Sequence, residues 1–95
     1  MKIIITESFK ERLEKQVAFI AADSPSRSRK FKNDIIRAIH KILPKPFKHR
    51  QSIYFEDPDI RDLIFKGYTV VFRVNQEKDV IEVFGFVKYQ QNLTE

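Results

Sequence analysis

Three basic side chains interrupt a largely apolar segment in the second half of this 95-residue chain. The segment is IRDLIFKGYTVVFRV, residues 60–74, and it contains Arg61, Lys66 and Arg73. Guanidinium and ammonium groups bind phosphates and carboxylates, because they carry positive charge and several N–H donors. Two interpretations follow: a hairpin that only completes a small sheet, or a hairpin that presents a basic surface to an acidic partner.

Basic residues are also concentrated between residues 27 and 50, where Asp34 is the only acid. The nine cations of this region are Arg27, Arg29, Lys30, Lys32, Arg37, Lys41, Lys45, Lys48 and Arg50. Such an asymmetry predicts a polyanionic partner, for example nucleic acid, an acidic protein or a ribosomal surface. A solvated helix face followed by a loop explains the same charges equally well.

The composition excludes several kinds of chemistry. The chain has no cysteine, and therefore no disulfide, thiolate nucleophile or zinc thiolate. His40 and His49 have no carboxylate at metal-ligand spacing, so we expect no metal ion and no cofactor. No apolar run resembles a signal peptide or could span a bilayer, and we therefore expect a cytoplasmic protein with a single domain, residues 1–95.

Hydrophobic periodicity predicts a strand and two helices in the first half of the chain. A β-branched run at residues 2–6 indicates a buried strand. We expect a first helix capped by Ser8, with Glu11 completing a capping box. A second helix should start at Ser24-Pro25 and run to about Leu43. The expected inward residues are Phe9, Leu13, Val17 and Ile20 in the first helix, and Phe31, Ile35, Ala38, Ile39 and Ile42 in the second.

The second half of the chain reads as strands. We expect extended segments at residues 52–55, 60–65, 68–74 and 80–89, with a tight turn at Lys66-Gly67. The predicted fold class is α+β, with the order β-α-α-β-β-β and two antiparallel helices packed on one face of a mainly antiparallel sheet. Strict alternation in the last strand places Phe84 and Phe86 together on the opposite face, where they predict a partner site.

The C-terminal half resembles the RelE/ParE superfamily, toxins of bacterial type II toxin–antitoxin systems. The resemblance depends on an ordered set of motifs: Arg61-Asp62-Leu63 opening a strand, a Gly67-Tyr68 turn, Phe72-Arg73-Val74 closing the next strand, and Gln91-Asn92 at the end of the last. It covers nearly the whole chain and implies the same β-α-α-β-β-β order. It also implies a cognate antitoxin, commonly with an acidic amphipathic segment.

The superfamily offers two targets. RelE-like members cut mRNA in the ribosomal A site without a metal, and ParE-like members inhibit DNA gyrase. At three positions where many relatives carry arginine this chain has Ile64, Thr69 and Gln90. These differences favour gyrase inhibition over mRNA cleavage, and they also leave open a divergent, inactive member.

If the chain is a nuclease, the resemblance assigns catalysis to Arg61, Arg73, Lys88 and Tyr89. A Lys88/Tyr89 pair could do acid–base work if burial shifted the pKa of the lysine. The competing interpretation makes Lys88 a solvated strand end, Tyr89 a packed ring and Arg61 a structural ion pair with Asp59 or Glu82.

The residues expected to bind the target or the antitoxin are Lys30, Arg37, Lys41, Arg61, Lys66, Arg73, Phe84, Phe86 and Lys88. A different function, a basic nucleic-acid-binding module built on residues 25–43, stays open as well. Charge reversal at Lys30, Arg37 and Lys41 would abolish that activity.

Overall fold

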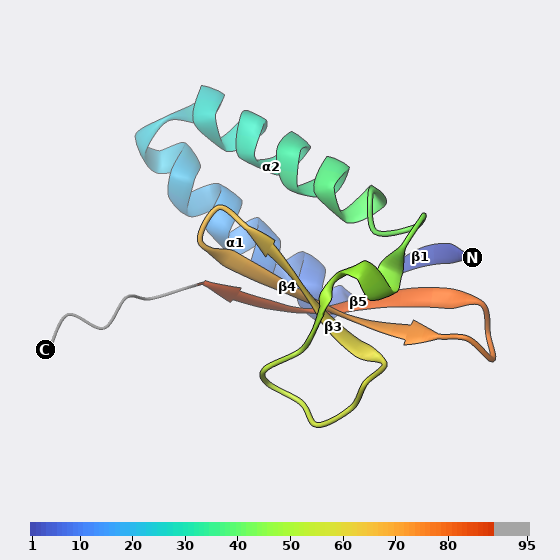
Figure 1. The fold of residues 1–95 in the computed structure, drawn as a ribbon. Helices are drawn as coiled ribbons and strands as arrows, with labels where there is room; N and C mark the ends of the chain where they lie inside the picture. The colour runs from blue at the N-terminus through green and yellow to red at the C-terminus, as the bar shows by residue number, and fades with distance from the viewer. Residues whose placement is uncertain (89–95) are drawn as a thin grey trace, which may run out of the picture.

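The chain forms two layers, a five-stranded sheet and a helical hairpin that covers one face of it (Figure 1). The computed structural model describes residues 1–88. The elements are β1 (Lys2–Ile5), α1 (Glu7–Asp23), α2 (Pro25–His40), a 3-10 turn (Pro46–Lys48), β2 (Arg50–Gln51), β3 (Ile60–Phe65), β4 (Tyr68–Asn75) and β5 (Val80–Lys88). The predicted α+β class, with its helices on one face, is confirmed.

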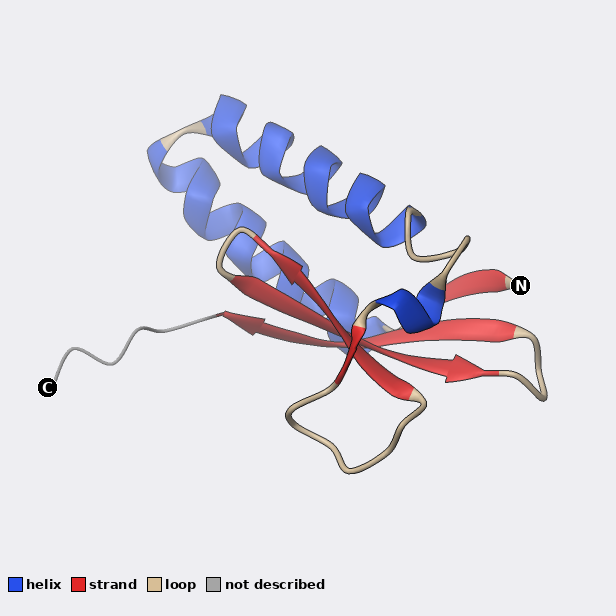
Figure 2. Cartoon of the chain, in the orientation of Figure 1, coloured by secondary structure: helices blue, strands red, loops and turns tan. Residues whose placement is uncertain are grey.

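The sheet has the strand order β1-β5-β4-β3-β2. β1 pairs with β5 in parallel, and the other neighbours are antiparallel (Figure 2). The turn between β3 and β4 falls at Lys66 and Gly67, whose φ angles of 45° and 82° are left-handed. Two such residues form the hairpin turn that matches the twist of a sheet, and the predicted turn is confirmed.

The start of α1 differs from the expectation. Thr6, not Ser8, is the N-cap, and its hydroxyl accepts a hydrogen bond from the Phe9 N–H at 3.2 Å. Thr6 is the last residue before the helix and keeps the extended backbone that an N-cap needs, so Ser8 already lies inside the first turn. The prediction for α2 is confirmed at its start: Ser24 caps the Arg27 N–H at 3.3 Å and Pro25 follows.

The predicted strand at residues 52–55 is wrong. In this part of the chain only Arg50 and Gln51, which form β2, pair with β3, opposite Asp62 and Arg61. The Asp62 carboxylate then accepts a hydrogen bond from the Ile53 N–H at 3.1 Å, which turns the chain away from the sheet. α2 also ends earlier than expected, at His40, and residues 41–44 form turns ahead of Pro46.

A bulge in β5 overturns the alternation predicted for the last strand. Val71 faces Gly85 and Phe72 faces Val83, so Phe84 is an extra residue without a partner in β4. Phe84 therefore lies on the far face, whereas Phe86 returns to the helix side and is only 7% exposed. Glycine is required beside the bulge, because a Cβ at residue 85 would lie 2.8 Å from the Val71 Cβ.

The core lies between the helices and the sheet. Its aromatic centre is Phe86, which meets Phe9 edge to face at 5.5 Å between ring centroids and stacks on Tyr68 at 5.2 Å. The other buried members include Leu13, Ile35, Ile39, Ile42, Leu63, Val70, Phe72, Val74, Ile81 and Val83. The helical stripes predicted from periodicity supply most of the helix side of this core.

The far face of the sheet is less open than the sequence predicted. Residues 52–59 form a loop beneath it (Figure 1), and Phe55 contacts Phe84 at 5.6 Å between ring centroids. Val71, on that face, is only 2% exposed. A smaller exposed apolar area remains where Ile53 and Tyr54 of this loop lie near Ile64 of β3, around a hollow of about 400 Å³.

Candidate functional site

Arg61 and Arg73, two of the residues to which the resemblance assigns catalysis, lie on opposite faces of the sheet. Residues paired across neighbouring strands point to the same side. Arg61 pairs with Phe72, which belongs to the helix-facing core. Arg73 pairs with Ile60 and with Glu82 on the other side. The two arginines therefore cannot converge on one phosphate.

The Arg61 side chain holds the loop that follows α2. Its Nε donates to the Pro58 carbonyl at 2.8 Å and its Nη1 to the His49 carbonyl at 3.0 Å. The guanidinium also lies 4.8 Å from the centre of the Phe47 ring. The competing interpretation predicts an ion pair of Arg61 with Asp59 or Glu82. Instead, the Arg61 guanidinium donates its hydrogen bonds to main-chain carbonyl oxygens.

Arg73 lies between two carboxylates. Its Nη1 is 3.1 Å from Asp57 Oδ2, and its Nε is 3.9 Å from Glu82 Oε1. The first contact ties β4 to the loop beneath the far face. Both predicted catalytic arginines thus have acceptors within the described chain, and the tyrosine of the proposed Lys88/Tyr89 pair lies outside the described residues.

The basic flank of α2 surrounds its one acid. Asp34 is 2.9 Å from Lys30, 3.2 Å from Arg37 and 3.3 Å from Lys66. The hydrogen bonds from Lys30 and Lys66 hold the pKa of the Asp34 carboxyl below its usual range. Lys66 lies in the β3–β4 turn, so this cluster also links the helix to the hairpin. Lys41 lines a hollow next to it.

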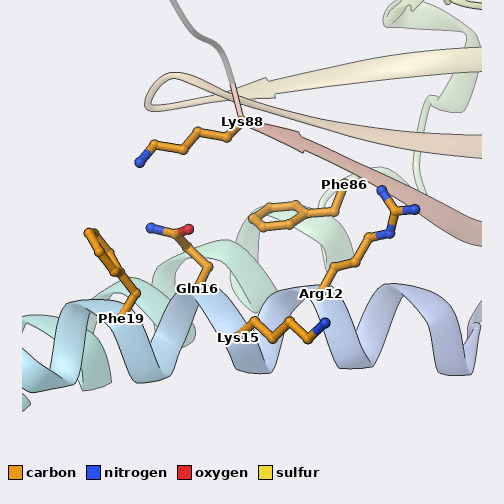
Figure 3. Close-up of a pocket in the computed structure, with 6 residues that line it drawn as sticks. All are labelled: Arg12, Lys15, Gln16, Phe19, Phe86 and Lys88. Atoms are coloured by element: carbon orange, nitrogen blue, oxygen red, sulfur yellow. The ribbon is translucent and has the colours of Figure 1, made fainter.

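Lys88 lies at a cleft that the sequence did not predict. An open hollow of about 610 Å³ lies between α1 and the end of β5, and it is lined by Arg12, Lys15, Gln16, Phe19, Phe86 and Lys88 (Figure 3). We call it the α1–β5 cleft. Phe19 is 68% exposed, and the Lys88 Nζ is 5.3 Å from the centre of its ring.

The residues of α1 that line the cleft are brought together by their helical spacing. Arg12, Lys15, Gln16 and Phe19 recur at steps of three and four, so they share one face of α1 (Figure 3). This spacing is visible in the sequence, but nothing there shows that the end of β5 lies opposite. The floor is Phe86, which the bulge turns inward.

The cleft offers two kinds of group that can bind a ligand. Its cations can hold anionic groups, and the exposed Phe19 ring can hold an apolar group. Tyr68 stacks on Phe86 at the floor; burial raises the pKa of its phenol, and a hydrogen bond from Gln16 partly offsets this.

Within residues 1–88 no three His, Asp or Glu side chains gather as a metal site would require. No described helix is long and apolar enough to cross a membrane.

This architecture, a β-α-α-β-β-β chain with a helical hairpin over one sheet face, is that of the RelE/ParE toxin superfamily. A family model for the ParE toxin of the type II toxin–antitoxin system parDE matches residues 3–93. The chain therefore belongs to the ParE toxin family, and its function implies an antitoxin partner. A search of curated proteins finds no match to the chain.

Proposed function

We propose that this toxin inhibits DNA gyrase and is not a ribosome-dependent nuclease. The observation that carries the proposal is the separation of Arg61 and Arg73 on opposite faces of the sheet, each bound to acceptors of its own chain. Membership of the ParE family supports the same target, because the ParE-like branch of the superfamily acts on gyrase.

The physical argument concerns what each activity needs. Metal-free RNA cleavage needs a base, an acid and positive charge that converge on one phosphate, with donors about 3 Å from the reacting oxygens. Arginines on opposite faces cannot supply that convergence without refolding the sheet. Inhibition of an enzyme needs only a surface with suitable shape and charge, which this chain offers in its cations and exposed aromatic rings.

The test compares both targets with the same purified toxin. We expect loss of DNA supercoiling and accumulation of cleaved DNA when toxin is added to gyrase, and unchanged transcripts when it is added to translating ribosomes. In cells, induced expression without antitoxin should trigger DNA damage signalling. Codon-linked cuts in ribosome-bound mRNA, with gyrase unaffected, would overturn the proposal.

A further inference from the structure

A hollow between α2 and the β3–β4 turn is surrounded by cations. Its volume is about 250 Å³, and it is lined by Asp34, Arg37, Ala38, Lys41, Phe65 and Lys66. Arg37 and Lys41 come from α2 and its C-cap, whereas Lys66 comes from the turn that joins two strands. The packing of the helix against the sheet therefore creates a cationic hollow that neither segment has alone.

The acid in this hollow does not neutralise it. The Asp34 carboxylate lies 2.9 Å from Lys30, 3.2 Å from Arg37 and 3.3 Å from Lys66, so one negative charge faces three positive ones. The Lys30 and Arg37 side chains are 73% and 66% exposed, and ion pairs as exposed as these are weak. Cations that converge on a carboxylate can exchange it for a phosphate, which offers them more acceptor oxygens.

The same cations belong to a polar face that runs along α2 to its C-cap. The face consists of exposed side chains that recur at steps of three and four: Ser26, Lys30, Asn33, Arg37 and Lys41. It extends for about 22 Å. B-DNA carries one phosphate charge for about every 1.7 Å of its axis, so a duplex along this face brings several phosphates within reach. Hydroxyl and amide side chains also bind phosphate oxygens, which suits Ser26 and Asn33.

The composition of this face fits duplex DNA better than a protein or a single strand. None of the large apolar side chains of α2 is exposed. Protein interfaces have apolar and aromatic residues at their centre and contain few lysines. Single-stranded nucleic acids need aromatic rings on which their bases stack. A duplex keeps its bases stacked inside and presents phosphates, for which cations and small polar side chains suffice.

We propose that the hollow and the polar face of α2 form a binding site for the phosphate backbone of duplex DNA. A phosphate lies in the hollow, where Arg37, Lys41 and Lys66 donate hydrogen bonds to its oxygens. Lys30 and Asn33 contact neighbouring phosphates, and no base is read. The role of this site rests on the proposed function, because gyrase acts on DNA and a toxin that holds the same DNA stays close to the enzyme.

DNA binding can be measured on the full-length toxin without gyrase. The probe is a short fluorescein-labelled DNA duplex of mixed sequence, and fluorescence anisotropy gives its Kd at a series of salt concentrations. We expect log Kd to rise with log salt with a slope of about 2–3, since about two or three phosphates release their counterions. An RNA duplex of the same sequence, a thymidine oligonucleotide and polyglutamate are the comparison ligands.

Variants of the toxin locate the site. Lys41→Glu and Lys66→Glu should each weaken DNA binding by about tenfold. Asp34→Asn should tighten binding by about threefold, because it removes the negative charge from the hollow and keeps the size of the side chain. Lys78→Glu is the matched control, an exposed lysine in the β4–β5 turn at the other end of β4 from Lys66, and should change Kd by less than about twofold. Circular dichroism will verify that each variant is folded.

Gyrase provides the second readout. Lys41→Glu and Lys66→Glu should raise the toxin concentration that halves supercoiling by about threefold or more, and Lys78→Glu should leave it unchanged. Unchanged inhibition by a folded variant that has lost DNA binding would remove the site from the toxin's action. A wild-type toxin that binds DNA as expected but leaves gyrase active would support the site and contradict only the proposed target.

Three results would contradict the DNA site itself. One is failure of the folded wild-type toxin to bind the duplex at low salt. Another is a loss of affinity in Lys78→Glu as large as that in Lys41→Glu, which would mean that only the total charge matters. The third is tighter binding of the RNA duplex, the single strand or polyglutamate than of the DNA duplex.

Discussion

At the scale of single residues, Asp62 shows how the far face is held together. Its side chain is fully buried. Its Oδ2 accepts hydrogen bonds from Arg50 at 3.2 Å and from the Ile53 N–H at 3.1 Å, whereas its Oδ1 has no partner among the described residues. A buried carboxylate with one unsatisfied oxygen depends strongly on the cation that remains.

Arg50→Ala should therefore destabilise the protein. Removing the guanidinium leaves the Asp62 carboxylate buried without a cation, and we expect a loss of roughly 1–3 kcal/mol in the free energy of unfolding. Urea denaturation measures the loss. The double variant Arg50→Ala/Asp62→Asn should recover part of it, because the neutral amide removes the buried charge. An Arg50→Ala midpoint equal to that of the wild type would contradict the assignment.

A second residue-scale prediction concerns pH. The His49 ring packs edge to face on Phe72 at 5.6 Å, and burial, with a smaller effect of Lys48, lowers the pKa of its imidazole below 6.5. The folded state thus binds fewer protons at His49 than the unfolded state does. The resulting stability is complete above pH 6.5 and is lost as the pH falls through the folded-state pKa.

Denaturation at pH 8 and at pH 5.5 measures this effect. We expect the drop in stability between the two values to be smaller in His49→Gln than in the wild type, since the variant has no imidazole to charge. His40→Gln is the control, because His40 is exposed at the end of α2, and it should keep the wild-type drop. Equal drops in all three proteins would exclude His49 as the cause.

At the scale of elements, the helix caps decide where each helix begins. Thr6 caps α1 and connects it to β1, whose last main-chain bond is made by the same residue to Val83. One threonine thus ends the parallel strand and starts the helix, and this fixes the helix over β5. Ser24 likewise connects the two helices, because it is both the C-cap of α1 and the N-cap of α2.

Thr6→Ala should lower the free energy of unfolding by about 1 kcal/mol, the usual effect of removing an N-cap oxygen. Ser8→Ala should have an effect of less than about 0.5 kcal/mol, because within residues 1–88 the Ser8 hydroxyl is hydrogen-bonded only to the Thr6 hydroxyl, at 3.2 Å. Thermal or urea denaturation of the pair distinguishes the observed cap from the one that the sequence suggested. A larger effect at Ser8 would support the original expectation.

At the scale of the whole molecule, the helical hairpin closes one face of the sheet and the loop of residues 52–59 covers part of the other. Arg61 contacts the loop that follows α2, and Arg73 contacts the loop of residues 52–59, so we propose that both arginines are structural. The α1–β5 cleft and the area at Ile53, Tyr54 and Ile64 remain as surfaces that another chain can reach.

Arg61→Gln and Arg73→Gln should therefore reduce stability but leave gyrase inhibition within about threefold of the wild type, when compared at equal amounts of folded protein. A residue that contacts gyrase directly, as an interface hot spot, would instead cause a loss of about 100-fold, which corresponds to about 2–3 kcal/mol. The measurement is the toxin concentration that halves supercoiling, with the melting temperature recorded for each variant. A loss of 100-fold in a folded variant would show that the arginine acts directly on the target.

Features that depend on neighbours in the chain were predictable. The apolar stripes at Phe9 and Leu13 and at Ile35 and Ile39 follow from the period of a helix, and the Lys66-Gly67 turn follows from the need for positive φ. The motif set from Arg61 to Asn92 was sufficient to indicate the superfamily, which the family match confirms. Periodicity and turn chemistry are local, so they can be read without a structure.

Features that depend on pairing between distant segments were not predictable. The bulge at Phe84 exists because Gly85 approaches Val71 closely, and one extra residue moves Phe86 from the far face to the core. A single-residue shift reverses every later side chain in a strand, because the period is two. Strict alternation therefore gave the wrong position for Phe86.

The sequence by itself determined the two helices, the hairpin, the basic charge and the toxin family, since each depends on residue type and spacing along the chain. Only the tertiary structure decided which cations are available to a partner. Asp34 binds Lys30, Arg37 and Lys66, Asp57 binds Arg73, and the main-chain carbonyls of His49 and Pro58 bind Arg61. The packing of α1 against β5, in contrast, brings together Arg12, Lys15 and Lys88. The physical reason is that a charge acts over a few ångströms in space, and the chain brings acceptors that are far apart in sequence within that reach.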